Sequence, residues 1–117
     1  MKEKDFENRV KAFLMKNNIW ALKTWSNGIQ RQGIPDLLCC INGFFVAVEI
    51  KAERGKPSKL QNWNIEKIRE SGGIGIVLYP NQFDDFVQLI KGLKSVTPML
   101  DGISEQFDER KGKNEFI

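Results

Sequence analysis

Residues 33–51 read GIPDLLCCINGFFVAVEIK, and this stretch predicts a β-hairpin that fixes where its charged side chains lie. Asn42-Gly43 separates two apolar runs, which is typical of a two-residue turn with positive φ angles. Counting outward from that turn places Asp36 directly opposite Glu49. Between the turn and these two acids, the predicted cross-strand pairs are Ile41 with Phe44, Cys40 with Phe45, Cys39 with Val46, Leu38 with Ala47 and Leu37 with Val48.

The predicted register brings two acids and one lysine together. Side chains alternate along a strand, so Asp36, Glu49 and Lys51 project from one face, with opposed Cβ atoms roughly 4.5–5.5 Å apart. Opposed carboxylates repel each other, and burial raises the pKa of one of them unless a cation lies between them. The alternative is an edge hairpin in solvent with an ordinary ion pair, but the run Phe44 to Val48 is too apolar for a wet edge.

A divalent metal is the natural cation for such a pair. Mg²⁺ or Mn²⁺ prefers hard oxygen ligands and usually keeps several waters, which leaves room for a substrate phosphate and an attacking water. The ammonium group of Lys51 could hold or help deprotonate that water and offset the charge that develops in the transition state. The pattern predicts a hydrolytic metal site.

The same residues resemble the signature of the PD-(D/E)XK nucleases. Within that superfamily, Gly33-Ile34-Pro35-Asp36, then Glu49-Ile50-Lys51, then Gln61 is similar to the pattern of the virus-type replication-repair nuclease (VRR-NUC) domain, over about residues 3–92. The resemblance implies a mixed sheet flanked by helices. It also implies that Asp36, Glu49 and the backbone carbonyl of Ile50 are metal ligands and that Lys51 serves the water.

Gln61 has two interpretations. The segment Ser58 to Gln61 is typical of a capping box, in which both side chains satisfy N–H groups at the start of a helix. Gln61 also stands at i, i+4, i+7 spacing with Ile65 and Ile68, which places it on the helix face that packs on the sheet. The two roles need not exclude each other.

A further acid is expected from the first helix, because the family usually draws one glutamate from it. Glu3 and Glu7 are both candidates. On a helical wheel Glu3 falls nearer the centre of the apolar stripe and Glu7 borders it, but Glu3 is expected in a frayed terminal turn. We therefore choose Glu7. The alternative is that both acids only favour the helix N-terminus electrostatically.

The remaining patterns predict an α/β (α+β) fold with a restriction-endonuclease-like core, a mixed sheet flanked by helices in the order αβββαβα. A crossover helix between two apolar strands implies parallel pairing of residues 44–52 with 75–79. Besides the hairpin, the expected elements are a helix from about Asp5 to Lys16, a strand near Trp20 to Trp25, a helix from Lys59 to about Glu70, a strand from Gly75 to Tyr79 and a helix from about Asp84 to Gly92.

Length and composition fit a single compact domain: 117 residues, of which 41% are hydrophobic and 28% charged. We assign residues 1–94 to the nuclease domain. Residues 95–117 are expected to form a tail that is disordered or contacts a dimer partner, with apolar anchors at 99–100 and 116–117. The sequence lacks an apolar run of membrane-spanning length and begins with charged residues, so a cytoplasmic protein of a bacterium or phage-infected host is expected.

Several kinds of chemistry are excluded. The chain contains no histidine, which rules out Ser-His-Asp and Cys-His nucleophiles and His-dependent zinc hydrolases. It lacks the glycine-rich motifs of nucleotide-binding loops. Cys39 and Cys40 are adjacent in a strand and point to opposite faces, so they suit neither a disulfide framework nor a zinc site.

Positive charge is placed beside the predicted site. The net charge is only +3, but the loop after Glu49 carries Arg54, Lys56 and Lys59, and Arg31 could add a contact from the other side. A cluster this short is more often a solvated loop, but its position next to the acids predicts that these residues bind the DNA backbone. Trp20, Trp25 and Trp63 could stack on bases, but aromatic residues in strands and helices are usually core or interface, and we do not assign them that role.

The sequence therefore predicts a Mg²⁺- or Mn²⁺-dependent DNA endonuclease of viral or mobile-element type that acts on branched DNA, as a homodimer. The alternatives are a catalytically inactive nucleic-acid-binding domain that keeps the fold, with its acids in ion pairs, and a purely structural subunit.

Overall fold

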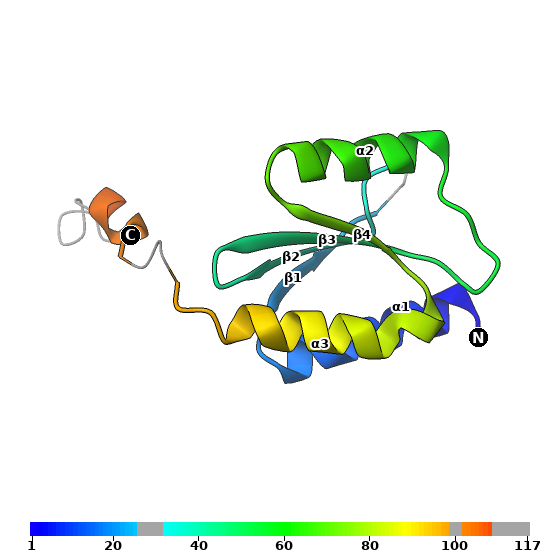
Figure 1. Cartoon of the computed structure of the whole chain (residues 1–117), viewed down its shortest axis with the longest axis horizontal. Coiled ribbons are helices and arrows are strands. Elements are labelled where there is room, and N and C mark those ends of the chain that lie inside the picture. Colours follow the sequence, from blue (N-terminus) through cyan, green and yellow to red (C-terminus); the bar gives the residue numbers. More distant parts are fainter. Residues whose placement is uncertain (26–31, 99–101, 109–117) are drawn as a thin grey trace.

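The computed structural model describes residues 1–25, 32–98 and 102–108 (Figure 1). The predicted order αβββαβα is confirmed, with two 3₁₀ turns added. The elements are α1 (Glu3–Lys16), β1 (Trp20–Lys23), β2 (Leu37–Ile41), β3 (Phe44–Ile50), α2 (Lys59–Glu70), β4 (Ile74–Leu78), η1 (Pro80–Gln82), α3 (Phe83–Lys94) and η2 (Ser104–Phe107).

The four strands form one mixed sheet in the order β1-β2-β3-β4. β1 and β2 are antiparallel, as are β2 and β3, whereas β3 and β4 are parallel, as the crossover through α2 requires. Figure 1 shows α2 on one face of this sheet and α1 with α3 on the other. The chain is thus a three-layer α/β/α sandwich.

The hairpin register is as predicted, from Ile41 opposite Phe44 to Leu37 opposite Val48. Asn42 and Gly43 have φ angles of 50° and 88°, as the two-residue turn requires. The side-chain amide of Asn42 also donates to the backbone carbonyls of Leu93, Lys94 and Val96 at 2.8–2.9 Å, at the end of α3. The turn therefore sets the register and also satisfies carbonyl groups at a helix C-terminus.

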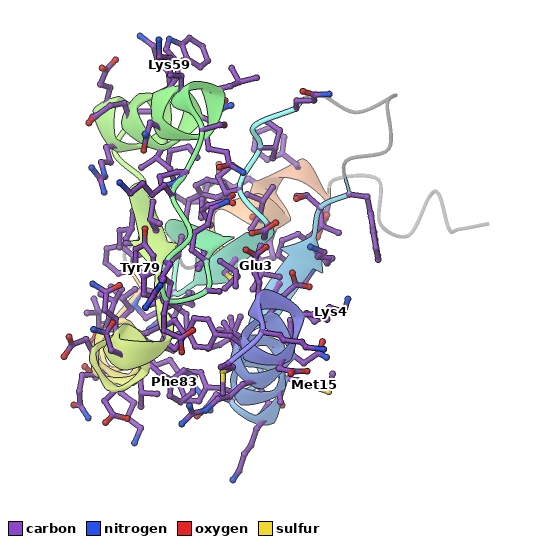
Figure 2. All side chains as sticks on the ribbon, turned by 90° about the vertical axis from the view of Figure 1, so that its right-hand side faces the viewer. Glu3, Lys4, Met15, Lys59, Tyr79 and Phe83 are labelled. Atoms are coloured by element: carbon purple, nitrogen blue, oxygen red, sulfur yellow. The ribbon has the colours of Figure 1, made fainter. Side chains whose placement is uncertain are left out.

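The hydrophobic core lies between the sheet and the α1–α3 layer. Val46, Val48 and Ile50 alternate along β3 toward this layer and are fully buried, as is Phe6 of α1. Phe83 joins the two helices, because its ring makes edge contacts with Phe6 and Phe13 at centroid distances of 6.3 and 5.8 Å (Figure 2). This alternation leaves Glu49 on the other face of the sheet.

The α2 layer covers the β3–β4 side of that other face. α2 packs chiefly on β4 and β3, and its Ile65 carbonyl lies 3.0 Å from where a Cβ of Gly75 would stand. Trp20 and Leu22 of β1 and Phe45 at the start of β3 lie on this face and are 62%, 49% and 43% exposed. An apolar area of sheet therefore faces solvent beside α2.

Some boundaries differ from those predicted. α1 begins at Glu3, two residues before the expected Asp5, and β1 ends at Lys23 rather than Trp25. The residues of η2 are exposed, and the apolar anchors expected at 99–100 and 116–117 lie outside the described residues. The division at residue 94 stays a prediction. Within the described ranges, the helices are too short or too polar to cross a membrane.

Gly33 and Gly92 make a matched pair for testing the loop that leads into β2. Gly33 has a φ of +81°, and a Cβ there would lie 2.5 Å from Leu60 Cγ of α2, whereas a Cβ on Gly92 would meet nothing within 4 Å. We expect Gly33→Ala to lower the free energy of unfolding by about 1–3 kcal/mol. Gly92→Ala should raise it by about 0.5–1 kcal/mol, because alanine favours the helix. Urea unfolding measures both, and equal effects would contradict this placement of the loop.

Candidate active site

The side chains singled out from the sequence come from the end of β3 and the starts of α1, α2 and β2. The end of β3 and the starts of α1 and α2 lie at the right-hand end of the sheet in Figure 1, which is the near end in Figure 2. Each comes from a different element. Glu7 is in α1, Asp36 precedes β2, Glu49 is in β3, Lys51 follows β3, and Gln61 is in the first turn of α2.

Asp36 is held from two sides. The Thr24 hydroxyl donates to the carbonyl of Pro35 at 2.8 Å, and the Thr24 N–H donates to the carbonyl of Asp36 at 2.9 Å, which fixes the backbone. The Ile50 N–H donates to Asp36 Oδ2 at 2.8 Å, while Oδ1 lies 3.7 Å from Lys23 Nζ. The carboxylate thus touches the end of β3 with one oxygen and faces the end of β1 with the other.

Glu49 is a buried acid, 2% exposed. Its Oε2 accepts a hydrogen bond from Gln61 Nε2 at 2.8 Å and lies 3.4 Å from Lys51 Nζ. Its Oε1 is buried and has no hydrogen-bond partner in the described part of the chain. Burial, with the negative charge of Asp36 adding to it and Lys51 opposing it, raises the pKa of Glu49 to about 7. The acids at positions 36 and 49 therefore interact, as the register implied.

Glu7 is also buried but has cationic partners. Lys23 Nζ lies 2.9 Å from its Oε1, and Lys11 Nζ lies 3.3 Å from its Oε2. Burial alone would raise the pKa of Glu7, but the hydrogen bonds and charges of the two lysines outweigh burial and lower it. Glu7 thus forms an ion pair within the same cluster as Asp36, because Lys23 faces both acids.

The two glutamates of α1 differ in burial. Glu7 is buried beside Phe6 and Val10, whereas Glu3 is exposed, because the core does not extend to the first turn of α1. Glu3 is nevertheless near the site, since its negative charge makes a small contribution to the raised pKa of Glu49. The choice of Glu7 as the helix acid stays a prediction.

Gln61 forms the predicted capping box and also contacts Glu49. Its Oε1 accepts from the Ser58 N–H at 2.8 Å while the Ser58 hydroxyl accepts from the Gln61 N–H at 3.1 Å, so the capping box is present. Its Nε2 is left to donate to Glu49. The helix cap thereby orients the amide toward the buried acid, and a catalytic role for Gln61 stays a prediction.

Sequence reasoning missed two lysines of this cluster, of which Lys23 is the more central. The register of β1 with β2 pairs Lys23 with Leu37, the residue after Asp36, so a prediction of the β1–β2 pairing would have found it. Lys11 was missed as well, although it stands one helical turn after Glu7 and pairs with it at i, i+4.

Among the described residues, no group of three acidic, histidine or cysteine side chains has an arrangement that could hold a metal ion. Lys23 faces Glu7 and Asp36. One oxygen of Asp36 accepts a hydrogen bond from the Ile50 N–H, and one oxygen of Glu49 accepts a hydrogen bond from Gln61. The donor set still suits a hard cation, because Glu49 Oε1 is an unpaired buried oxygen beside a second carboxylate. The contact that links Ile50 to Asp36 uses the N–H of Ile50, and the proposed role of its carbonyl stays a prediction.

A pocket of about 290 Å³ opens beside these groups, and Lys4, Glu7, Lys23, Trp25, Asp36 and Gln61 are among the residues that line it. The loop after β3 is anchored by the Tyr79 hydroxyl, which donates to the Gly55 carbonyl at 2.8 Å. Arg54, Lys56 and Lys59 are exposed on or next to this loop. Arg31 lies outside the described residues.

The mixed sheet flanked by helices, with acids, lysine and glutamine at one end, defines a restriction-endonuclease-like fold. The model of one family, described as archaeal Holliday junction resolvase (Hjc), matches residues 1–72, which is more than half of the chain and includes Glu7, Asp36, Glu49, Lys51 and Gln61. The chain belongs to the archaeal Holliday junction resolvase family. This family is one of PD-(D/E)XK-like nucleases, so the superfamily is supported and the VRR-NUC assignment stays a prediction. No curated protein matches the chain.

The raised pKa of Glu49 predicts a pH-dependent stability. Because the folded-state pKa lies near 7 and the ordinary value is 4.5, the protonated acid stabilises the fold fully below about pH 4.5, and this stabilisation is lost as the pH rises through 7. In EDTA, Glu49→Gln should therefore raise the melting temperature at pH 8, on the order of 5 °C, and change it less at pH 5.

Thermal denaturation at both pH values measures this difference. The control is Glu66→Gln, which replaces an acid on α2 whose side chain is 61% exposed and should give nearly the same shift at both pH values. A Glu49→Gln effect that does not depend on pH would show that the acid is not held in a desolvated environment.

Proposed function

We propose that this chain is a divalent-metal-dependent endonuclease that cuts branched DNA, such as a Holliday junction or a flap, in the replication, recombination or repair of a virus or mobile element. The observation that carries the proposal is the buried Glu49, with an unpaired oxygen, interacting with Asp36 and lying 3.4 Å from Lys51 Nζ. Membership of the resolvase family supports the junction as the substrate.

In this proposal Asp36, Glu49 and the carbonyl of Ile50 hold Mg²⁺ or Mn²⁺, which when bound would polarise the scissile phosphate and lower the pKa of an attacking water. Lys51 offsets negative charge on the reacting phosphate and holds the water, because its ammonium group is already placed at the edge of the acid pair. Gln61 orients the Glu49 carboxylate through its 2.8 Å hydrogen bond. Arg54, Lys56 and Lys59 contact the DNA backbone.

Cleavage assays test the proposal on a panel of four-way junction, flap, nicked duplex, single strand and linear duplex, with Mg²⁺ or Mn²⁺. Asp36→Asn and Lys51→Met should each lower the cleavage rate roughly 100-fold or more, since each removes a group that acts on the transition state. Glu66→Gln and Lys67→Met make the same chemical changes on the exposed surface of α2 and should cut as the unaltered protein does.

The contacts of Lys23 favour a second candidate, a nucleic-acid-binding domain that does not cleave. In that case the ion pairs of Lys23 with Glu7 and Asp36 would be structural. Binding to junctions without cleavage of any substrate, at every metal concentration tried, would establish this second function and overturn the first.

We also propose that the protein acts as a homodimer, joined through the uncovered sheet face of Trp20, Leu22 and Phe45. The residues opposite these exposed apolar side chains in the sheet are Cys40 and Leu38, which are uncharged. This face is therefore better suited to bind an apolar protein surface than a phosphate backbone. A hollow of about 530 Å³, lined in part by Phe45 and Ile68, continues this face toward α2. A two-fold axis would place the same face of each protomer in contact.

Sedimentation velocity tests the dimer. Leu22→Glu should convert a dimer to a monomer, because it places a charge within the apolar face, whereas Met15→Glu on the exposed side of α1 should leave the dimer intact. Circular dichroism of both variants confirms that they fold. An unaltered protein that is monomeric at tens of micromolar would overturn the dimer and leave the cleavage proposal standing.

A further inference from the structure

Trp25 does not lie where the sequence pattern placed it. It was expected in a strand, but β1 ends at Lys23, and Trp25 lies beyond the strand end. Its side chain is 61% exposed, so it is not a core residue. It lines the pocket of about 290 Å³ that Glu7, Asp36 and Gln61 also line. An aromatic surface is thus presented to solvent at the candidate catalytic pocket.

The charges around this ring complement a nucleotide. Lys23 Nζ lies 5.6 Å from the centroid of the Trp25 ring, and Lys4 also lines the pocket. Cations suit the phosphate of a nucleotide, and the face of an indole ring suits the face of its base. The pocket therefore combines the two kinds of group that a single nucleotide requires, next to the acids that would act on its phosphate.

The two other tryptophans occupy different environments. Trp20 lies on the uncovered sheet face, paired with Cys40, and Trp63 lies on α2, where Lys67 Nζ is 5.5 Å from its ring. Both are exposed, at 62% and 53%, but neither lines the pocket of the acids. All three tryptophans are therefore exposed, but of the three Trp25 lies beside the candidate site.

We propose that Trp25 stacks on a nucleobase adjacent to the scissile phosphate and thereby selects DNA in which a face of that base is unstacked. An intact duplex must first unpair and unstack a base before its face can reach the indole ring. A branch point, flap or single strand already offers an unstacked base. Trp25 is in this sense a specificity-determining residue, and the proposal rests on the proposed nuclease function for the identity of the pocket.

Fluorescence gives a readout that does not depend on cleavage. The chain has three tryptophans, so replacing Trp20 and Trp63 by phenylalanine leaves Trp25 as the emitting tryptophan. Ca²⁺ replaces Mg²⁺ in the titration, to limit cleavage. Titration with a four-way junction and with an oligothymidine should quench the emission at concentrations where an equal length of duplex does not. Emission that stays unchanged while the junction binds in a gel-shift assay would overturn the stacking.

A double-mutant cycle between protein and DNA identifies the stacked base. Abasic sites are placed one at a time within three nucleotides of the junction branch point. At one position the unaltered protein should lose roughly tenfold in affinity, whereas Trp25→Ala should lose nothing further there. Trp25→Phe should retain part of the effect, and Trp63→Ala should behave as the unaltered protein.

The outcomes separate this inference from the nuclease proposal. Equal sensitivity to every abasic site in the unaltered protein and Trp25→Ala would overturn the stacking, even if the junction is cleaved. Quenching together with a position-specific abasic effect would support it, even if cleavage is never observed. Urea unfolding of the Trp25 variants checks that each of them folds.

Discussion

The turn at Asn42-Gly43 is the constraint on which the site depends, because it fixes which residues of β2 and β3 lie opposite each other. A slip of one residue would turn every side chain of one strand to the other face. Val46 and Val48 would then leave the core, and Glu49 would enter it. The Asn42 side chain reinforces the turn by bonding carbonyls at the end of α3, 2.8–2.9 Å away. The same residue thus couples hairpin register to the packing of the helical layer.

With the register fixed, the fold must accommodate a desolvated acid. Glu49 is 2% exposed, and one of its oxygens has no hydrogen-bond partner within the described residues. Gln61 and Lys51 compensate in part, through a 2.8 Å hydrogen bond and a 3.4 Å ion pair on the other oxygen. The raised pKa shows that this compensation is incomplete. A structural role alone would be served better by an apolar residue at this position.

Local signals made the hairpin and α2 predictable from sequence. The Asn-Gly turn needs only its neighbours, and the capping box of Ser58 and Gln61 gave the start of α2 to the residue. Lys23 was missed because its role depends on the pairing of β1 with β2 and on the packing of α1 beside β1. The burial of Glu7 likewise depends on where the core stops along α1. Both depend on tertiary contacts that helical periodicity does not encode.

The end of β1 also depends on tertiary contacts, and its position determines which residues line the candidate site. The apolar residues from Trp20 to Trp25 resemble one continuous strand, but pairing with β2 stops at Lys23, beside Leu37. The Thr24 N–H still donates to the Asp36 carbonyl opposite it, and the Thr24 hydroxyl donates to the Pro35 carbonyl. Trp25 therefore leaves the sheet at the point where Asp36 enters it, and both line one pocket.

Asp36 joins the two halves of this site. Lys23, which also pairs with Glu7, reaches it from the α1 side of the sheet, and Glu49, Lys51 and Gln61 belong to the α2 side. One Asp36 oxygen lies 3.7 Å from Lys23 Nζ and the other accepts from the Ile50 N–H at 2.8 Å, next to Glu49, whose pKa the charge of Asp36 raises. Only a residue at the end of a sheet can do this, because within a sheet the strands separate the two faces. The position of the acids at the strand ends is therefore what allows helices from opposite layers to contribute to one site.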